Sequence, residues 1–262
     1  MKKIYLTIVM SIVMLAACDE VGIDDRLIYV EPPQVSRAVL IEDFTGQYCV
    51  NCPRATEEIE RLVEEYGDST VIAVAIHSGP FSKRQGEFTP LYTQQGDDYF
   101  THWGLSAQPV GLVDRIYSSY PFDFTDWAAG VNYEVARKAP VSIDVAADVD
   151  DEGLAHARVQ VIGLDSARVA GKLQLWLVED SIDSFQLMPD GSRNDHYNHM
   201  HVFRASLNGA WGDDIAVNHG QVSDKSYDFL LDDAWIPRHC AIVAFVYDND
   251  GVQQVTKRKL IE

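Results

Sequence analysis

The stretch Val39–Arg54, which reads VLIEDFTGQYCVNCPR, decides the fold prediction for the first half of the chain. It opens with an apolar run of the length of a buried β-strand, and Gly46 then marks a turn. Beyond the cysteines, apolar residues recur at spacings of three and four, which is typical of an amphipathic helix. Pro53 suits the first helical turn, because its missing N–H would have no partner there. We predict a strand, a turn and a helix that opens at the two cysteines.

Cys49 and Cys52 form a Cys-x-x-Cys pair at this predicted helix start. The thiolate is the nucleophile in disulfide exchange, and a free cysteine with a pKa of about 8.5 is only slightly ionised at neutral pH. The helix dipole and the unpaired N–H groups of the first turn favour the thiolate. We therefore predict Cys49, nearer the turn and more exposed, as the nucleophile and Cys52 as the resolving thiol. Two alternatives stay open: half of a zinc site, or a purely structural disulfide.

Three features over Val39–Lys138 resemble the thioredoxin superfamily: the strand ending in Asp43, the Cys-x-x-Cys helix start, and Gln108-Pro109-Val110. In that superfamily a buried strand aspartate assists proton transfer to the resolving cysteine, and a cis proline shapes the groove for the partner. The resemblance implies these catalytic roles for Asp43 and Pro109. Tyr48 replaces the usual Trp and Val50-Asn51 replaces Gly-Pro, so the redox potential of thioredoxin does not carry over.

More closely, the chain resembles the Omp28-related outer-membrane lipoproteins, a family with a thioredoxin-like domain plus a β-rich half. The segments that carry the resemblance are Phe44-Thr45-Gly46, Cys49 to Pro53, Pro109 to Arg115 and His201 to Gly209. Together they span most of the chain. The resemblance implies a fold and a location more than an activity.

The N-terminus reads as a lipoprotein export signal. Residues 1–17 hold two lysines and then the apolar run Ile4–Leu15, which is too short to span a bilayer. Leu15-Ala16-Ala17-Cys18 resembles a lipobox, which implies a diacylglycerol anchor on Cys18 and hence membrane attachment through lipid. Residues 18–37 are acidic and contain Pro32-Pro33, which indicates a solvated tether. We expect a lipoprotein of the bacterial outer membrane, at its periplasmic face or at the cell surface.

The composition excludes one class of partner. The chain has 262 residues, of which 47% are hydrophobic, so it can bury a core. Lys plus Arg number 21 against 40 Asp plus Glu, a net charge of −19. Such a chain repels phosphate backbones, and nucleic-acid binding is excluded.

The sequence predicts two domains after the tether, residues 38–139 and residues 140–262. From Val141 onward, short alternating strands are separated by Asp/Gly turns, a pattern typical of an antiparallel sandwich. The predicted strands are Val141–Val145, Ala157–Ile162, Leu173–Val178, Val202–Leu207, Tyr227–Leu231 and Ile242–Tyr247. Asp250-Gly251 is predicted to be a hairpin turn. The expected fold class is an α/β thioredoxin-like domain followed by an all-β immunoglobulin-like sandwich domain.

Other candidate sites have simpler interpretations. His196, His199 and His201 suggest a metal pair, with His219 or Asp195 as a further ligand, but no third ligand is defined, so a hydrogen-bonded loop is the preferred interpretation. Cys240 heads an apolar run and is expected to be buried and unpaired. We expect no metal and no cofactor.

Two functions of different class follow. The first is a thiol-disulfide oxidoreductase that exchanges electrons with protein thiols or disulfides of the envelope through Cys49 and Cys52. The second is a non-catalytic outer-membrane or surface lipoprotein, in which the cysteines form a structural disulfide and the β-rich half binds a protein or glycan partner.

Overall fold

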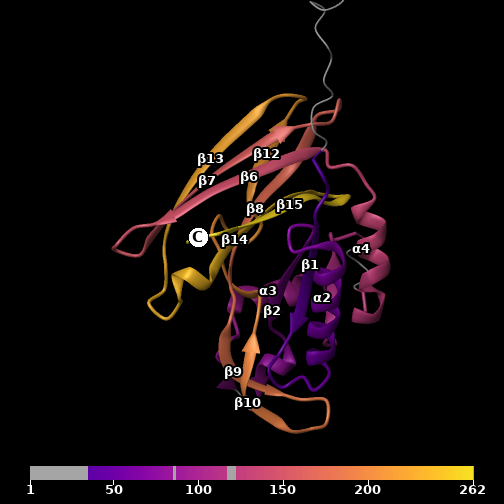
Figure 1. Ribbon diagram of the computed structural model, residues 1–262, viewed down its shortest axis with the longest axis vertical. Coiled ribbons are helices and arrows are strands. Elements are labelled where there is room, and N and C mark those ends of the chain that lie inside the picture. The colour runs from indigo at the N-terminus through magenta and orange to yellow at the C-terminus, as the bar shows by residue number, and fades with distance from the viewer. Residues whose placement is uncertain (1–34, 85–86, 117–121, 262) are drawn as a thin grey trace, which may run out of the picture. The chain divides into compact units, whose positions relative to one another are not determined.

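Strand β1 (Val39–Thr45) and helix α2 (Cys52–Tyr66) form where the opening stretch predicts them (Figure 1). All seven residues of β1 are buried, the polar Glu42 and Asp43 among them, because both faces of this strand are covered. Helix α2 has Pro53 in its first turn and buries Ala55, Ile59 and Leu62 along one face. It ends at Gly67, whose φ of 91° is accessible to glycine at little cost.

The computed structural model describes residues 35–84, 87–116 and 122–261. Its other helices are α3 (Gln94–His102) and α4 (Trp127–Val135), with short 3-10 helices at Pro80–Ser82, Phe124–Asp126 and Pro237–His239. The first strands after β1 are β2 (Val71–His77), β3 (Lys83–Arg84), β4 (Glu87–Phe88) and β5 (Val110–Val113). The later strands are β6 (Val141–Val149), β7 (Leu154–Gly163), β8 (Val169–Glu179), β9 (Ile182–Leu187), β10 (Arg193–His199), β11 (Val202–Ser206), β12 (Asp213–Val217), β13 (Val222–Leu230), β14 (Cys240–Asp248) and β15 (Gly251–Lys259). Within these ranges, no helix has the length and apolar character needed to cross a membrane.

One mixed sheet takes strands from both halves of the chain. Its order is β15-β14-β8-β11-β2-β1-β5, and β12 also pairs with β8. Strand β2 runs parallel to β1 and to β11, and the other neighbours are antiparallel. The β2–β11 junction is a short pairing in which Val202 lies opposite Ala75, and the Ala75 N–H donates to the carbonyl of His201 (2.8 Å).

Each face of this sheet is covered (Figure 1). One face carries an aromatic-rich core with α3, built around Phe44, Tyr99, Trp176, Phe203 and Phe245. On the other face, α2 and α4 pack against the β1–β2 end. Beside them, the separate three-stranded sheet β13-β7-β6 packs against β8 and β14. Because side chains alternate along a strand, odd and even residues of β1 and β8 enter different cores.

The expected fold class, an α/β thioredoxin-like domain followed by an immunoglobulin-like sandwich, is wrong. The described residues are mostly β-strand, with α2, α3 and α4 as their α-helices, and two of these have nine residues each. Strands β1 and β2 share a sheet with β8, β11, β14 and β15, whereas the prediction gave each half a sheet of its own. The reason is that local patterns identify strands but not their long-range partners.

Several predicted strands are confirmed within longer ones, among them those at Val141, Ala157, Leu173 and Ile242. The Asp-Gly hairpin between β14 and β15 is confirmed as well. The polar hairpin β9–β10 and strand β12 were not predicted, because their sequences lack apolar alternation.

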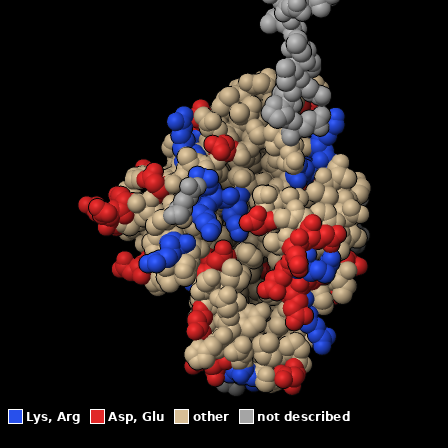
Figure 2. Space-filling model, in the orientation of Figure 1, with Lys and Arg blue, Asp and Glu red and all other residues tan. Residues whose placement is uncertain are grey.

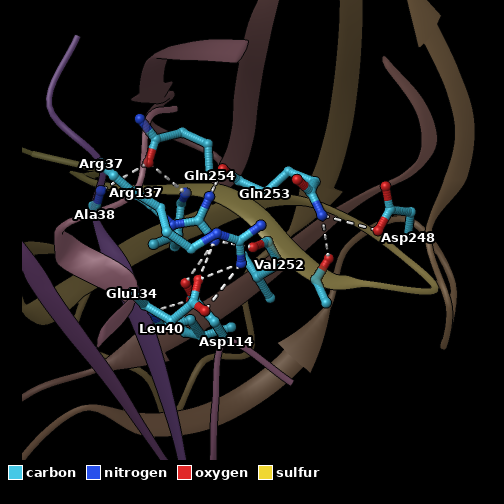
Figure 3. A network of polar contacts seen from close by, with 12 residues as sticks. Arg37, Ala38, Leu40, Asp114, Glu134, Arg137, Asp248, Val252, Gln253 and Gln254 are labelled. Atoms are coloured by element: carbon cyan, nitrogen blue, oxygen red, sulfur yellow. Dashed lines mark hydrogen bonds and ion pairs between the residues drawn. The ribbon is translucent and has the colours of Figure 1, made fainter. Parts of the chain in front are cut away.

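A buried ion-pair network joins the start of the described chain to its end (Figure 3). The Arg37 guanidinium donates to the carboxylates of Asp114 (3.0 Å) and Glu134 (2.6 Å), and all three side chains are fully buried. It also donates to the carbonyls of Val252 (2.5 Å) and Gln253 (2.7 Å) in β15. The other Asp114 oxygen accepts the backbone N–H at the second residue of β1 (2.7 Å). One cation therefore connects β1, α4, β15 and the turn after β5.

A second buried arginine connects β1 to the aromatic core. Arg115 pairs with Glu42 of β1 (2.6 Å), and both side chains are almost completely buried. The guanidinium carbon lies 4.4 Å from the ring centre of Tyr247 and 4.9 Å from that of Phe245. The paired carboxylate and the rings together compensate for the lost hydration of the guanidinium.

We predict that replacing Arg37 with Met lowers the free energy of unfolding by about 3–5 kcal/mol, because Asp114 is left buried without its cation and Glu134 keeps only its pair with Arg137 (2.9 Å). Urea denaturation measures this change. Arg61→Met is the matched control, since the exposed pairs of Arg61 with Glu58 and Glu65 lie along α2 and a much smaller effect is expected. Equal losses in the two variants would contradict the role given to the network.

Candidate functional site

The two predicted cysteines are joined in the loop between β1 and α2. Cys49 and Cys52 form a disulfide with an S–S distance of 2.16 Å. The Cys49 N–H donates to the carbonyl of Gly46 (3.0 Å), and Cys52 is the first residue of α2. Both cysteines are buried, each with 2% of its surface exposed. The expectation that Cys49 is the more exposed of the two is therefore wrong.

The hairpin β9–β10 covers the disulfide loop. The side-chain amide of Gln186 donates to the carbonyls of Cys49 (2.9 Å) and Gly46 (3.3 Å), and Gln186 itself is 3% exposed. These bonds satisfy loop carbonyls that water would otherwise solvate. The cover comes from a segment far along the chain, which no pattern near the cysteines indicates.

Further bonds attach the same loop to the hairpin. The Gln47 side chain donates to Ser184 Oγ (2.9 Å) and to the carbonyl of Phe185 (2.7 Å), while the Leu187 N–H donates to the Gln47 carbonyl (2.9 Å). The rings of Tyr48 and Phe185 lie 5.3 Å apart. A partner could reach the sulfur atoms only after these contacts are broken.

Asp43 lies near the end of β1, opposite Ala75 of β2 and Gly111 of β5. It is 1% exposed, and its Oδ1 has no hydrogen-bond partner among the described residues. Burial disfavours the charged carboxylate and raises its pKa to about 8. Asp43 and Cys52 line one small cavity of about 20 Å³, which is enough for a single water molecule.

Two histidines line the same cavity from opposite elements. His77 ends β2 and His199 ends β10, and their rings lie 5.3 Å apart. Burial lowers the pKa of His77 well below its usual range and lowers that of His199 to about 4. Both imidazoles are therefore neutral at pH 7, and His199 Nε2 lies 3.3 Å from the carbonyl of Phe185.

The remaining histidines that the sequence singled out are dispersed. His196 pairs with Asp183 on the exposed hairpin (3.1 Å), and His201 pairs with Asp180 (2.9 Å). His219 Nδ1 lies 3.0 Å from the Leu164 carbonyl. Within the described ranges, no three His, Cys, Asp or Glu side chains gather closely enough to hold a metal ion.

Pro109 follows a cis peptide bond and precedes β5. The side-chain amide of its neighbour Gln108 donates to the carbonyls of Thr45 (2.6 Å) and Ser78 (2.9 Å), which fixes this segment at the ends of β1 and β2. The structure thus brings Asp43 and Cys52 to one cavity, and Pro109 is not among the residues that line it. Cys18, the expected lipid site, lies outside the described residues.

Cys240 is buried and reduced at the start of β14. Burial raises the pKa of its thiol to about 12, so the thiolate is not formed at neutral pH. The expectation of a buried, unpaired cysteine is confirmed. The sequence did not point to Gln186 or Tyr197, and it indicated His199 only as a candidate metal ligand, because all three residues belong to the unpredicted hairpin.

We predict that Asp43 makes the folded chain less stable as pH rises. Its pKa is about 8 in the folded chain against 3.8 for the unperturbed group, so the folded state holds an extra proton between these values. The free energy of unfolding should then fall by up to about 1.4 kcal/mol per pH unit until pH 8. Urea unfolding at pH 7 and pH 8 tests this slope.

Asp43→Asn is the comparison for that measurement, since it removes the titrating proton and keeps the shape of the side chain. The variant should lose most of the slope between pH 7 and 8 and keep a smaller slope of the same sign from Asp114, because burial raises the pKa of that carboxyl to about 7. His77 and His199 act in the opposite direction, but only below the unperturbed histidine pKa of 6.5. Equal slopes of the free energy of unfolding against pH in wild type and Asp43→Asn would show that the pKa of Asp43 is not raised.

The chain was compared with known proteins. The Omp28 family, described as outer membrane protein Omp28, matches residues 96–262. HBP35 of Porphyromonas gingivalis has a similar fold, with a TM-score of 0.66 and 16% sequence identity over 86% of this chain and 76% of that chain. A domain of the outer membrane lipoprotein Omp28 from Porphyromonas gingivalis is 22% identical over 47% of this chain and 89% of that chain, with a TM-score of 0.35. No curated protein matches the chain.

The family match extends over more than half of the chain. It agrees with the family resemblance and with the outer-membrane location that the sequence suggested. The chain therefore belongs to the Omp28 family of outer membrane proteins.

Proposed function

We propose that this chain is a lipid-anchored, non-catalytic lipoprotein of the outer membrane that binds a protein or glycan partner through its β-rich part. In this proposal, Cys49–Cys52 is a structural disulfide. The observation that carries it is the burial of both cysteines, each 2% exposed, beneath the β9–β10 hairpin.

An oxidoreductase needs its nucleophilic sulfur within reach of a partner disulfide. Here Gln186 donates to the carbonyl of Cys49 itself, and the Tyr48–Phe185 ring contact closes the same side of the loop. Opening this site requires breaking several hydrogen bonds and exposing apolar rings. This arrangement favours a structural disulfide, which holds the β1–α2 loop in the conformation that forms hydrogen bonds with the β9–β10 hairpin.

The β-rich part offers a surface suited to binding. A groove of about 790 Å³ runs beside β8, β12 and the β14–β15 turn. Trp211 and Tyr247 line it, and Tyr247 Oη donates to the Trp211 carbonyl (2.8 Å). Charged groups of both signs share the groove, including Lys172 and Asp214, which pair at 2.7 Å. Aromatic faces beside paired polar groups are typical of sites that bind proteins or sugars.

The anchor is supported by sequence and family together. Leu15-Ala16-Ala17-Cys18 resembles a lipobox, and the family is one of outer membrane proteins. A covalent lipid is the attachment that a chain of net charge −19 needs, because anionic lipids repel it.

We predict that native protein shows no thiol-disulfide exchange. Dithiothreitol should reduce Cys49–Cys52 at least about a hundredfold more slowly in the folded chain than in 6 M guanidinium, since attack must await opening of the loop. Mass spectrometry after alkylation measures the rate, and an insulin-reduction assay tests turnover. Turnover of insulin by the native protein would overturn the proposal.

We also expect Cys49→Ser/Cys52→Ser to lower the free energy of unfolding by about 2 kcal/mol, the chain-entropy value for so short a loop. Cys240→Ser is the control for a buried cysteine outside the disulfide. The double variant should keep its far-UV circular dichroism. An unchanged urea midpoint would mean that the disulfide has no structural role.

For the anchor, Cys18→Ala should abolish incorporation of labelled palmitate and leave the full-length protein out of the outer-membrane fraction. The Cys240→Ser protein, fractionated in parallel, should be labelled like wild type. Labelling that survives Cys18→Ala would refute lipid attachment at this residue.

A further inference from the structure

A second cavity lies between β1, β2 and α2, and no role is assigned to it above. Its volume is about 140 Å³. Asp43, Ala73 and Ala75 line it from the sheet, and Ile59 and Glu60 line it from α2. Glu60 is exposed whereas Asp43 is 1% exposed, so the cavity leads from the surface of α2 down to the Asp43 carboxyl.

Asp43 is an unusual group to find at the inner end of a cavity. Its Oδ1 has no hydrogen-bond donor among the described residues, and no ion pair involves this carboxyl there. Buried polar atoms in native proteins nearly always have a partner, and buried carboxylates are usually paired with a cation. The side chain is therefore placed to receive a donor from a molecule that enters the cavity.

The walls and the volume limit what that molecule can be. Ile59, Ala73, Ala75 and Met200 give the cavity mainly apolar walls, which suit methylene groups. A dry apolar cavity of about 150 Å³ holds a six-carbon ring in another protein. A chain of four or five carbons with one charged end is of matching size.

The charged side chains at the mouth of the cavity determine whether the polar end of the ligand is a cation or an anion. Glu60 stands at the mouth, and α2 also carries Glu57 and Glu64, whereas its Glu58 and Glu65 pair with Arg61. Figure 2 shows acidic side chains gathered over the α2 side of this face. A cation is drawn toward such a mouth, while anions are repelled. Apolar walls exclude a strongly hydrated metal ion, and the described residues hold no cluster of metal ligands.

We propose that this cavity binds a primary alkylammonium group, with the ammonium on the Asp43 carboxylate and the methylene chain against Ile59 and Met200. A lysine side chain and a free alkylamine share this chemistry. The site goes beyond the proposed function and does not use the disulfide, although Asp43 also lines the small cavity beside Cys52.

The affinity should depend on pH through Asp43. Burial raises its pKa to about 8, so the carboxylate that pairs with the ammonium becomes more populated between pH 7 and 9. An alkylammonium keeps its proton in this range, since its pKa is about 10.4. The affinity of wild type should therefore rise about tenfold from pH 7 to pH 9.

Other titratable groups face Asp43 from each neighbouring element. His77 of β2 and His199 of β10 have lowered pKa values and stay neutral above pH 7, and Tyr197 of β10 has a raised pKa. On α2, Glu57 and Glu60 carry carboxyls, and Cys52 is held in the disulfide. His201, which pairs with Asp180 just before β11, also lines the cavity. The His201→Gln variant should keep the pH dependence of the affinity, which would show that this dependence does not come from the His201 ring.

The test uses n-butylamine with the full-length protein. Titration calorimetry gives the affinity at pH 7 and pH 9, and the ¹³C-methyl signal of Met200 reports binding at the cavity itself. Asp43→Asn should weaken binding at pH 9 at least tenfold and remove the pH dependence. Glu152→Gln, which removes an exposed carboxylate from the turn between β6 and β7, should change the affinity less than twofold. Butan-1-ol, which has the chain without the charge, should bind at least tenfold more weakly.

A second variant keeps the test informative if Asp43→Asn does not fold. Ala75→Leu fills the cavity and leaves Asp43 intact, and it should also abolish binding. A parallel titration with Nα-acetyl-lysine amide separates the two sources of the ammonium group. Binding as tight as that of butylamine indicates a lysine side chain of a partner. Selective binding of butylamine indicates a free amine. No shift of Met200 at 50 mM butylamine, equal binding of butan-1-ol, or unchanged affinity in both Asp43→Asn and Ala75→Leu would overturn the proposal. None of these results bears on whether the disulfide exchanges thiols.

Discussion

The buried ion-pair network of Arg37, Asp114 and Glu134 is the constraint on which the rest of the fold depends. A charge removed from water is tolerated only where opposite charges and hydrogen bonds replace its hydration. Arg37 finds two carboxylates and two carbonyls, and these belong to the turn after β5, to α4 and to β15. Strand β1, helix α4 and strand β15 must therefore come together before the buried charges of this network are paired. The Arg115–Glu42 pair places the same constraint on the aromatic core, since Arg115 is buried there and needs the carboxylate of β1.

Much of the local structure could be predicted from the sequence. The apolar run before Gly46 gives β1, and Pro53 with the three- and four-residue spacing gives α2, because these signals act through neighbours in the chain. The same local reasoning correctly expected the β14–β15 turn at Asp250-Gly251. The Cys-x-x-Cys spacing also placed the two sulfur atoms within bonding distance.

What could not be predicted depends on pairing between distant segments. The expected fold class was wrong because β2 has β11 as a neighbour, a choice that no local pattern encodes. The expected exposure of Cys49 was wrong for a related reason: it was argued from the helix next to Cys49, whereas burial of the loop depends on Gln186 in a polar hairpin. Strand β10, with the sequence RNDHYNH, has no apolar face by which a sequence pattern would find it.

The single junction between β2 and β11 has a consequence for how the chain is made. Strand β2 is complete at residue 77, but its neighbour on the side away from β1, which pairs with it at Ala75, begins at residue 202. Until that later segment has been synthesised and exported, the growing polypeptide carries an open, apolar sheet edge, which is a template for aggregation. Such long-range closure also slows folding. The nascent chain would therefore be expected to rely on chaperones during its passage to the outer membrane, and fragments that end before residue 202 would be expected to self-associate.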